Sequence, residues 1–250
     1  MIKQGIVIPV YNHGRAVGAV VEKLKPLGLP IILVDDGSDS ETKAILDEIH
    51  SSCPLTVSAA LKKNSGKGRA VIEGLITAEG LGLSHVLQID ADGQHDAQRA
   101  RFFLEESASH PQALICSYPE YDESIPASRF QGRKIANTWV KIVTLSSDIK
   151  ESMLGFRVYP IGHILGLYRH AILDWRMGFD VEILVRLNWK NIHMIYHPVK
   201  VSYPADGISH FRLLEDNARI SWVFTKLCLM MFPRLPVLLA RLIRRKRGKK

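Results

Sequence analysis

Short apolar runs alternate with segments of helical apolar spacing over residues 5–89. The runs cover residues 5–12, 31–34, 55–58 and 86–89, and the helical segments cover residues 16–24, 41–50 and 69–78. Runs rich in Ile and Val are typical of strands buried on both faces, and apolar residues three and four apart are typical of helices. The alternation predicts an α/β fold in which helices cover both faces of a mostly parallel, twisted sheet.

Acidic residues stand where two of the predicted strands end. Asp36 follows the second strand, and Asp90 and Asp92 follow the fourth. Ligands bind at the carboxyl ends of the strands in sheets of this kind, because the loops that carry polar groups meet there. We therefore expect these carboxylates to share one binding site.

Asp90 and Asp92 are two residues apart, so on an extended chain their side chains point the same way. Two hard oxygen ligands suit Mg²⁺ or Mn²⁺, with phosphate oxygens completing the shell. An acidic turn without a metal is the alternative. A helix-loop-helix calcium site is excluded because its sixth position is His95 rather than Gly and its twelfth is Arg101 rather than Glu.

Two common nucleotide-binding loops are absent from the sequence. The turn after the first strand, residues 9–14, lacks the Gly-x-Gly-x-x-Gly pattern of dinucleotide folds. The segment around Lys67 lacks the ATPase phosphate loop, because Leu61 replaces its first Gly and Gly68 replaces its Ser or Thr.

The later part of the chain predicts fewer elements. We expect a strand at 113–117, a helix at 129–145, a loop at 147–159, a helix at 178–189, and a late strand at 191–203 interrupted by Pro198.

The length of 250 residues suits one sizeable domain with an appendage, and the charged fraction of 23% excludes disorder of the whole chain. Three scattered cysteines indicate a reducing compartment, and the early first strand leaves no room for a signal peptide. The net charge is +8, of which residues 244–250 supply six, leaving 8 − 6 = +2 for the rest. The basic charge is thus a property of the tail.

The segment 211–243 is largely apolar, but charged residues divide it and Pro233 and Pro236 are expected to break its helix. A membrane-spanning helix needs about 20 mostly apolar residues, so spanning is not expected. An amphipathic segment lying on an anionic, cytoplasmic membrane surface is expected instead. A helix packed on the domain, or in a dimer contact, is the alternative. We divide the chain at residue 210, into a domain at 1–210 and a membrane-associating segment at 211–250.

The motifs together resemble those of the family 2 glycosyltransferases with the GT-A fold, nearest to the branch of dolichol-phosphate mannosyltransferases. The resemblance covers roughly residues 5–212. The matching stretches, in the family's order, are residues 8–12, 34–39, 64–68, 90–96, 155–156 and 179–182.

The resemblance implies a role for each matching position. Pro9, Tyr11 and Asp36 would surround the nucleoside of a UDP- or GDP-sugar, and Lys67 and Asp90 would lie near its ribose and diphosphate. Asp92 and Gln94 would hold the metal, with Asp90 contributing directly or through water. A divalent cation would stabilise the charge that develops on the nucleoside diphosphate as it leaves.

Two departures from the family concern the acceptor. His13 stands where an acid is common, and the Gly-x-Ser-Lys stretch of the lipid-phosphate branch reads Gly-Ile-Ser-His here, ending at His210. We therefore expect a hydroxyl acceptor, with Asp180 as general base and Glu182 supporting it. A cap at the start of a helix is the alternative role for both acids. Arg129, Arg133, His210 and Arg212 are candidates for acceptor binding.

The resemblance implies an inverting glycosyltransferase; with the strand-end carboxylates and the apolar, basic tail, we expect it to be metal-dependent and to act on a lipid-linked or other apolar acceptor at the inner face of the cell membrane. A polyprenyl-phosphate acceptor and a nucleotidyltransferase activity remain alternatives. A non-catalytic protein that binds RNA or membranes through the basic tail is the alternative from another class. No nucleic-acid partner is expected, because acids at the strand ends would repel a phosphate backbone.

Overall fold

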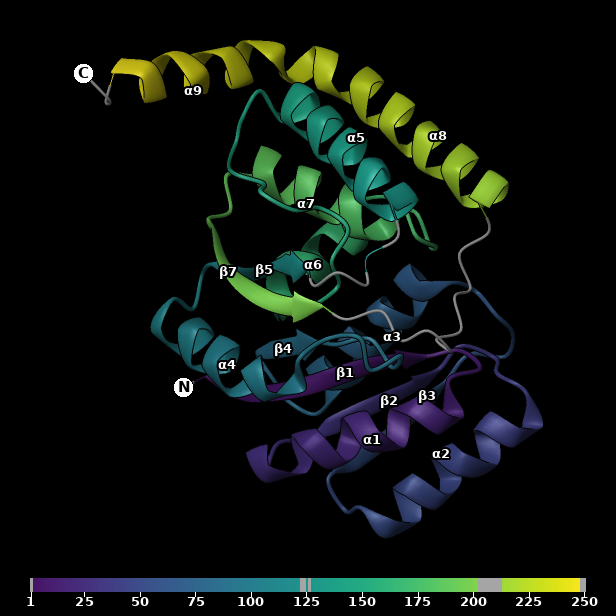
Figure 1. Cartoon of the computed structure of the whole chain (residues 1–250). Coiled ribbons are helices and arrows are strands. Elements are labelled where there is room, and N and C mark those ends of the chain that lie inside the picture. Colours follow the sequence, from purple (N-terminus) through teal and green to yellow (C-terminus); the bar gives the residue numbers. More distant parts are fainter. Residues whose placement is uncertain (1, 122–124, 126, 202–212, 248–250) are drawn as a thin grey trace.

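A seven-stranded sheet forms the centre of the protein in a computed structural model that describes residues 2–121, 125, 127–201 and 213–247 (Figure 1). The strands are β1 (Gln4–Val10), β2 (Ile31–Asp35), β3 (Thr56–Ala60), β4 (His85–Gln88), β5 (Leu114–Tyr121), β6 (Arg157–Pro160) and β7 (Met194–Val201). The longer helices are α1 (Gly14–Leu24), α2 (Ser40–Ser52), α3 (Lys67–Gly80), α4 (Ala100–Ser109), α5 (Ala127–Thr144), α6 (Ile161–Tyr168), α7 (Phe179–Trp189), α8 (Leu213–Met231) and α9 (Leu235–Arg247). One-turn 3₁₀ helices are η1 (Lys25–Leu27), η2 (Ala97–Arg99) and η3 (Phe232–Arg234).

The strand order is β3-β2-β1-β4-β6-β5-β7. β6 pairs antiparallel with both β4 and β5, and all the other pairs are parallel. The carboxyl ends of β1, β2, β3 and β4 therefore lie at one edge of the sheet. The mostly parallel sheet predicted from the sequence is confirmed.

Alternate residues of each strand enter two separate cores. On β1, Ile6 and Ile8 pack in one core with residues of α1 and α4, whereas Val7 packs in the other with residues of α3, α6 and α7. This division follows from the two-residue period of a strand, which turns successive side chains to opposite faces. The predicted helices on both faces of the sheet are thus confirmed.

The sequence prediction was wrong for the segment 147–159, which was expected to be loop. Its last residues belong to β6, and α6 follows directly, so the sheet contains one strand that the sequence did not predict. Four residues are too few for a period to show in the sequence. The late strand was predicted correctly: Pro198 lies within β7, where a missing N–H is tolerated because β7 is the edge strand.

The prolines interrupt the C-terminal α-helix as expected, because α8 ends at Met231, but the chain stays helical beyond them. α8 passes through one 3₁₀ turn, η3, into α9, and Pro233 and Pro236 each occupy the second position of a helical element. The first turn of a helix tolerates proline, because its N–H groups have no partner within the helix. One run among the described residues, Glu215–Arg245, is long and apolar enough by length and composition to cross a membrane, with 22% of its apolar window buried in the fold.

A close approach between α3 and β1 makes a prediction about Gly74. A methyl group at this position would lie well inside contact distance of the Val7 side chain, so α3 would have to move. We expect Gly74→Ala to lower the free energy of unfolding by about 1–3 kcal/mol in urea denaturation.

The matched control is Gly80→Ala in the same helix, where an added methyl meets nothing within 4 Å. It should be neutral or stabilise by up to about 1 kcal/mol. Equal effects of the two substitutions would contradict this account of how α3 packs.

Candidate functional site

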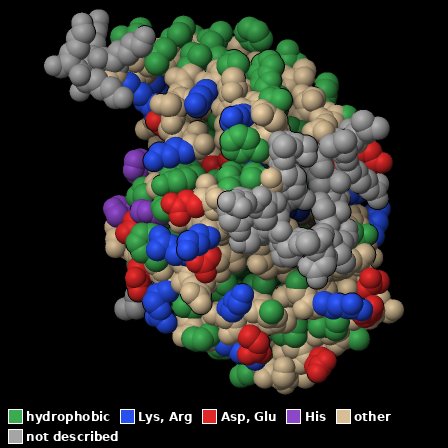
Figure 2. Space-filling model, viewed as in Figure 1, with side chains coloured by type: hydrophobic (Ala, Val, Ile, Leu, Met, Phe, Trp, Pro, Cys, Tyr) green, Lys and Arg blue, Asp and Glu red, His purple; other side chains and the backbone are tan. Residues whose placement is uncertain are grey.

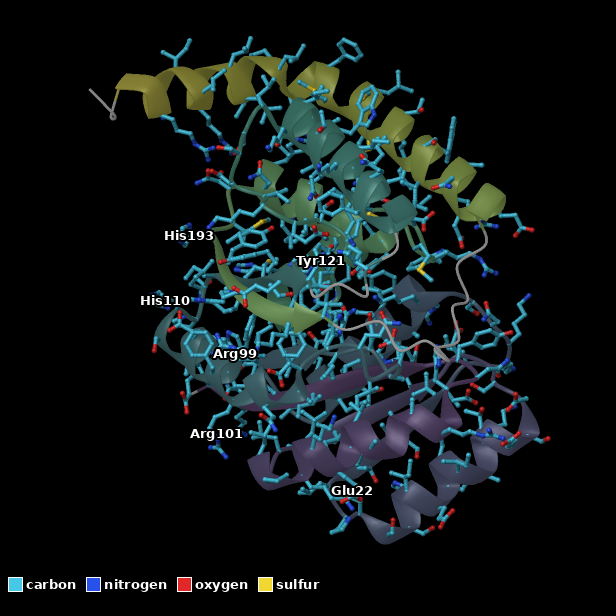
Figure 3. The ribbon with its side chains drawn as sticks, in the orientation of Figure 1. Glu22, Arg99, Arg101, His110, Tyr121 and His193 are labelled. Atoms are coloured by element: carbon cyan, nitrogen blue, oxygen red, sulfur yellow. The ribbon has the colours of Figure 1, made fainter. Side chains whose placement is uncertain are left out.

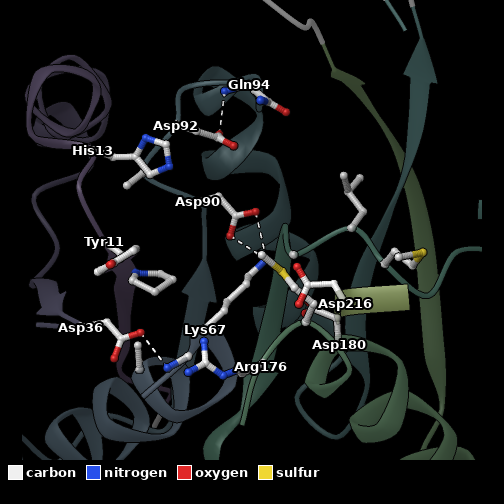
Figure 4. Close-up of a pocket in the computed structure, with 18 of the residues that line it drawn as sticks. Tyr11, His13, Asp36, Lys67, Asp90, Asp92, Gln94, Arg176, Asp180 and Asp216 are labelled. Atoms are coloured by element: carbon white, nitrogen blue, oxygen red, sulfur yellow. Dashed lines mark hydrogen bonds and ion pairs between the residues drawn. The ribbon is translucent and has the colours of Figure 1, made fainter. Parts of the chain in front are cut away.

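A cavity of about 760 Å³ opens at the carboxyl edge of the parallel strands (Figure 4). Its walls come from the loops after β1, β2 and β4, from the start of α3, and from α5, α7 and α8. The predicted site residues that line it are Pro9, Tyr11, Asp36, Lys67, Asp90, Asp92, Gln94, Arg133 and Asp180. The structure therefore brings together most of the predicted residues.

Side chains tie the loops after the first three strands to one another. Asn12 accepts a hydrogen bond from the backbone N–H of Asp39 at 2.9 Å, and its φ of 53° is in the left-handed region that Asn tolerates. The buried carboxylate of Asp36 accepts from the N–H groups of Ser65 and Gly66 at 2.7 and 2.8 Å. Burial raises the pKa of Asp36 although these hydrogen bonds oppose the shift. These bonds fix the wall where a nucleoside is predicted to bind.

The ammonium group of Lys67 is shared between two carboxylates at the centre of the cavity. Its Nζ lies 2.9 Å from Oδ1 and 3.0 Å from Oδ2 of Asp90, and 3.1 Å from Oδ2 of Asp180. Burial disfavours the charged lysine, but the two carboxylates outweigh burial and raise its pKa. Burial likewise opposes ionisation of Asp90, yet Lys67, with His95, lowers its pKa to about 2. Lys67 and Asp90 are therefore both charged near neutral pH.

Arg157 supports the site from behind the cavity lining, and the sequence reasoning missed it. Its guanidinium is fully buried behind Asp180, donates to the backbone carbonyl of Asp180 at 3.1 Å and lies 3.4 Å from its Oδ1. Burial disfavours the charged guanidinium, but Tyr159 and Asp180 outweigh burial and raise the pKa of Arg157. Asp90, Lys67, Asp180 and Arg157 thus form a chain of alternating charges whose sum is zero; we call it the four-charge network.

Gly155 leaves the space that this network occupies. A Cβ at this position would lie 2.6 Å from Nζ of Lys67 and 3.1 Å from Oδ1 of Asp90. Any larger residue would displace the shared ammonium group. The motif at 155–156, which the resemblance singled out, therefore has a direct physical explanation.

The predicted metal ligands lie together on the loop after β4. Oδ1 of Asp92 accepts from the backbone N–H of Gln94 at 3.0 Å, and both side chains line the cavity next to Asp90. Among the described residues, no three His, Cys, Asp or Glu side chains are arranged to hold a metal by themselves. The donor set fits a hard divalent cation that takes its other ligands from phosphate oxygens and water.

The rejection of a calcium loop is consistent with the structure. Arg101, at the twelfth position of that loop, lies on α4 and donates to the carbonyl of Pro26 (Figure 3). His95, at the sixth position, is buried, and its ring packs against that of Phe156 with 5.7 Å between the ring centroids. Burial lowers the pKa of His95 although Asp90 and Asp92 oppose the shift.

Arg176 also escaped the sequence reasoning, although it stands four residues before Asp180. Its side chain lines the cavity near Asp36 and donates to Oδ1 of Asn64 at 3.1 Å (Figure 4). Its backbone N–H donates to Oδ1 of Asp174 at 2.8 Å. This places a second cation beside the wall predicted for the nucleoside.

Glu182 lies outside the cavity lining, so its position does not support a role next to the reacting groups. Its fully buried carboxylate accepts from Nε of Arg186 at 2.7 Å, from Nζ of Lys226 at 2.8 Å and from the N–H of Asp174 at 2.8 Å. Glu182 therefore joins α7, α8 and the loop that carries Arg176.

The predicted acceptor residues are only partly described. Arg133 lines the cavity and its Nη1 pairs with Oε1 of Glu151 at 3.0 Å. The side chain of Arg129 and the residues His210 and Arg212 lie outside the described part of the chain. The sequence reasoning missed the contribution of α8, whose residues Glu215, Asp216, Asn217 and Arg219 also line the cavity.

Comparisons with known proteins agree with the fold and the motifs. The model of the family described as "Glycosyl transferase family 2" matches residues 5–170. An uncharacterized protein of Methanocaldococcus jannaschii is 31% identical over 217 residues, which cover 82% of this chain and 90% of that protein. Dolichyl-phosphate beta-glucosyltransferase of Dictyostelium discoideum is 26% identical over 208 residues, which cover 75% of this chain and 62% of that enzyme.

Other similarities are more local or more remote. Bactoprenol glucosyl transferase of Shigella phage SfV is 32% identical over 99 residues, which cover 37% of this chain and 31% of that protein. Among solved structures, glucosyl-3-phosphoglycerate synthase of Mycobacterium tuberculosis, in complex with Mn²⁺, UDP-glucose and phosphoglyceric acid, has a TM-score of 0.67 at 13% identity. That alignment covers 91% of this chain and 80% of the synthase.

The four-charge network makes a prediction about Lys67. Lys67→Met removes the cation that the carboxylates of Asp90 and Asp180 share, and removing one partner of a buried pair costs several kcal/mol. We expect urea denaturation at neutral pH, with metal chelated, to show a loss of about 3 kcal/mol. Lys63→Met, which removes an exposed lysine from the same loop, should change stability little.

The loss should depend on pH in a defined direction. The lowered pKa of Asp90 contributes stability above its ordinary value of 3.8, and this contribution disappears as pH falls toward 2. The difference between wild type and Lys67→Met should therefore shrink as pH falls below about 4. A difference that stays constant over this range would contradict the pairing of Lys67 with Asp90.

Proposed function

This chain belongs to glycosyl transferase family 2, and we propose that it transfers a sugar from a UDP-sugar to the phosphate group of a lipid-linked acceptor with the help of a divalent cation. The observation that carries the proposal is the single ammonium of Lys67 shared between Asp90 and Asp180 in a cavity at the strand ends. Its membership of the family makes the chain a glycosyltransferase. The base of the donor nucleotide, the acceptor and the metal are what we propose.

The donor would occupy the side of the cavity nearest β1 and β2. Pro9, Tyr11 and Asp36 would surround the nucleoside, and Arg176 adds a cation on the same side. Lys67 would face the diphosphate. It lies at the start of α3, after the loop that follows β3, and contacts Asp90 in the loop after β4. UDP-glucose in the structurally similar synthase supports a uridine donor.

The metal would be held by Asp92 and Gln94, with Asp90 contributing directly or through water. When bound, a divalent cation supplies charge stabilisation to the leaving diphosphate. Mn²⁺ in the similar synthase supports this part of the proposal.

We propose a phosphate acceptor because cationic side chains line the cavity and the carboxylate of Asp180 is already paired with two cations. Both oxygens of Asp180 face cations, Oδ2 toward Lys67 and Oδ1 toward Arg157, so neither is well placed to take a proton. An ionised phosphate needs no base: its oxygen attacks the anomeric carbon, and the bonding electrons of the broken C–O bond leave with UDP. Arg133 and Arg219 line the wall from which an anionic group would approach.

The names of two relatives point the same way. One, a dolichyl-phosphate beta-glucosyltransferase, names a lipid phosphate, and the other, a bactoprenol glucosyl transferase, names a lipid acceptor. A single displacement of this kind inverts the anomeric carbon. We place the reaction at the inner face of the cell membrane, with residues 1–210 as the main part of the catalytic domain and the first turns of α8 completing the cavity wall.

A hydroxyl acceptor remains a second candidate because Asp180 does line the cavity. A hydroxyl must lose its proton during attack and needs a carboxylate within hydrogen-bond reach. Asp180 would be that base, and Glu182 would act only by holding α7 and its neighbouring loop.

The metal assignment predicts the effect of Asp92→Asn. The variant should lose the Mn²⁺-dependent increase in UDP affinity measured by calorimetry, since an amide is a weaker ligand for a hard cation. Asp96→Asn is the control, because Asp96 caps the η2 turn and does not line the cavity. If Asp92→Asn retains the full Mn²⁺ effect, the metal site lies elsewhere.

The acceptor assignment predicts a preference between two matched lipids. With radiolabelled UDP-glucose or UDP-N-acetylglucosamine, sugar should pass to a polyprenyl phosphate and not to the corresponding polyprenol. Transfer to the polyprenol alone would overturn the phosphate assignment. In that case Asp180→Asn should lower transfer by about 10²–10⁴-fold, as expected for loss of a general base.

A further inference from the structure

Four cationic side chains of the helical run α8–η3–α9 turn toward the domain, whereas a surface helix ordinarily turns its charges to solvent. Each of these four has a partner on the body of the protein. The pairs are Lys226 with Glu182, Arg234 with the ring of Trp189, Arg241 with the carbonyl of Asn188, and Arg245 with Asp148.

Six large apolar side chains are exposed among the described residues of the same run. They are Trp222 (65% exposed), Leu229 (62%), Phe232 (64%), Val237 (55%), Leu239 (46%) and Ile243 (52%). Helix α5 lies beside α8, with the rings of Trp139 and Phe224 at 6.2 Å, and adds exposed Ile135, Trp139 and Ile142. We call these nine side chains the outer apolar surface; Figure 2 shows hydrophobic side chains gathered over α8 and α9.

We propose that the outer apolar surface lies in the interface of an anionic membrane, with α8 and α9 parallel to the bilayer plane. Exposed apolar patches of this extent mark docking sites on soluble proteins. Exposed cations next to the surface, Lys134, Lys141 and Arg244, complement an anionic lipid headgroup layer.

The contacts of α8 argue against a spanning arrangement. To cross the bilayer, the run would have to withdraw Lys226 from the buried carboxylate of Glu182 and expose Val223 and Leu227, which are now buried. It would also carry Arg234 and Arg241 into the hydrocarbon, where charged residues are costly. Lying in the interface keeps every one of these contacts.

The same exposed cations argue against a second copy of the chain as the occupant. A symmetric contact places the same patch on both partners, so Lys134, Lys141 and Arg244 of one copy would gather near those of the other. Anionic lipids instead neutralise them.

The surface also begins next to the cavity. Gly132 and Arg133 of α5 and Arg219 of α8 line the cavity, and Ile135 and Trp222 follow within three residues on the same helices. Three residues advance a helix by about 4.5 Å. If the acceptor is lipid-linked, which rests on the function proposed above, its chain would stay in the bilayer while its head group enters the cavity.

Co-sedimentation with vesicles tests the surface. Vesicles of phosphatidylglycerol and phosphatidylcholine in equal parts should bind the full chain. Trp222→Glu combined with Leu229→Glu should weaken binding about tenfold or more, because two apolar side chains are lost from the interface. Leu81→Glu is the matched control, since Leu81 is 47% exposed in the turn between α3 and β4, away from the surface; it should bind as wild type does.

The chain's own tryptophans report on its orientation. Trp139 and Trp222 belong to the surface, whereas Trp189 is buried and Trp175 partly buried. Brominated phosphatidylcholine in the same vesicles should quench the fluorescence of the wild type, and Trp139→Phe combined with Trp222→Phe should remove most of the quenching. Both variants substitute exposed positions, so the fold should persist.

The outcomes separate the alternatives. Full binding of the glutamate variant, or quenching that persists without Trp139 and Trp222, would overturn the proposal. Dissociation of a dimer by the glutamate substitutions, without vesicle binding by the wild type, would assign the surface to a second copy. UDP affinity should be unchanged in the variants, so a failure of donor binding in the wild type would count against the proposed function and not against the surface.

Discussion

The shared ammonium of Lys67 is the interaction on which the candidate site depends. It pairs with both Asp90, from the loop after β4, and Asp180, from the start of α7, and so joins these two walls of the cavity. Two carboxylates this close would repel each other without a cation between them. Arg157 balances the remaining charge from behind, and Gly155 leaves the space for the contact. Asp90 can therefore remain ionised in a partly buried cavity where a metal and a diphosphate are proposed to bind.

Sequence reasoning located the parts of the site that have a local signature. Short β-branched runs predict the strands that end just before Tyr11, Asp36 and Asp90. The carboxyl ends of these strands lie together because the strands are parallel. Arg157 was missed because nothing in its neighbours shows that a charged residue there is buried; its partner Asp180 is distant in sequence. Glu182 was expected near the chemistry because it is close to Asp180 in sequence. On a helix, however, residues two apart face different sides, and Glu182 turns toward Lys226.

The C-terminal run serves two parts of the molecule at once. Its first turns supply Asp216 and Arg219 to the cavity wall, and its later turns present the outer apolar surface. Its composition alone predicted an amphipathic appendage with scattered charges. The structure shows that these charges are its attachment to the domain, through Lys226 and Glu182 above all. A change in how α8 lies on the domain would therefore reach the loop of Arg176, because Glu182 also holds the N–H of Asp174.

A double-mutant cycle between Lys67 and Asp180 tests the central claim most directly. Stability would be measured by urea denaturation for the wild type, Lys67→Met, Asp180→Asn and the double variant, all with metal chelated. A shared ammonium predicts a coupling energy on the order of 2 kcal/mol, because the second substitution removes a carboxylate that the first has already left without its nearest cation. A coupling energy near zero would contradict the account, since it would mean that the two residues contribute independently.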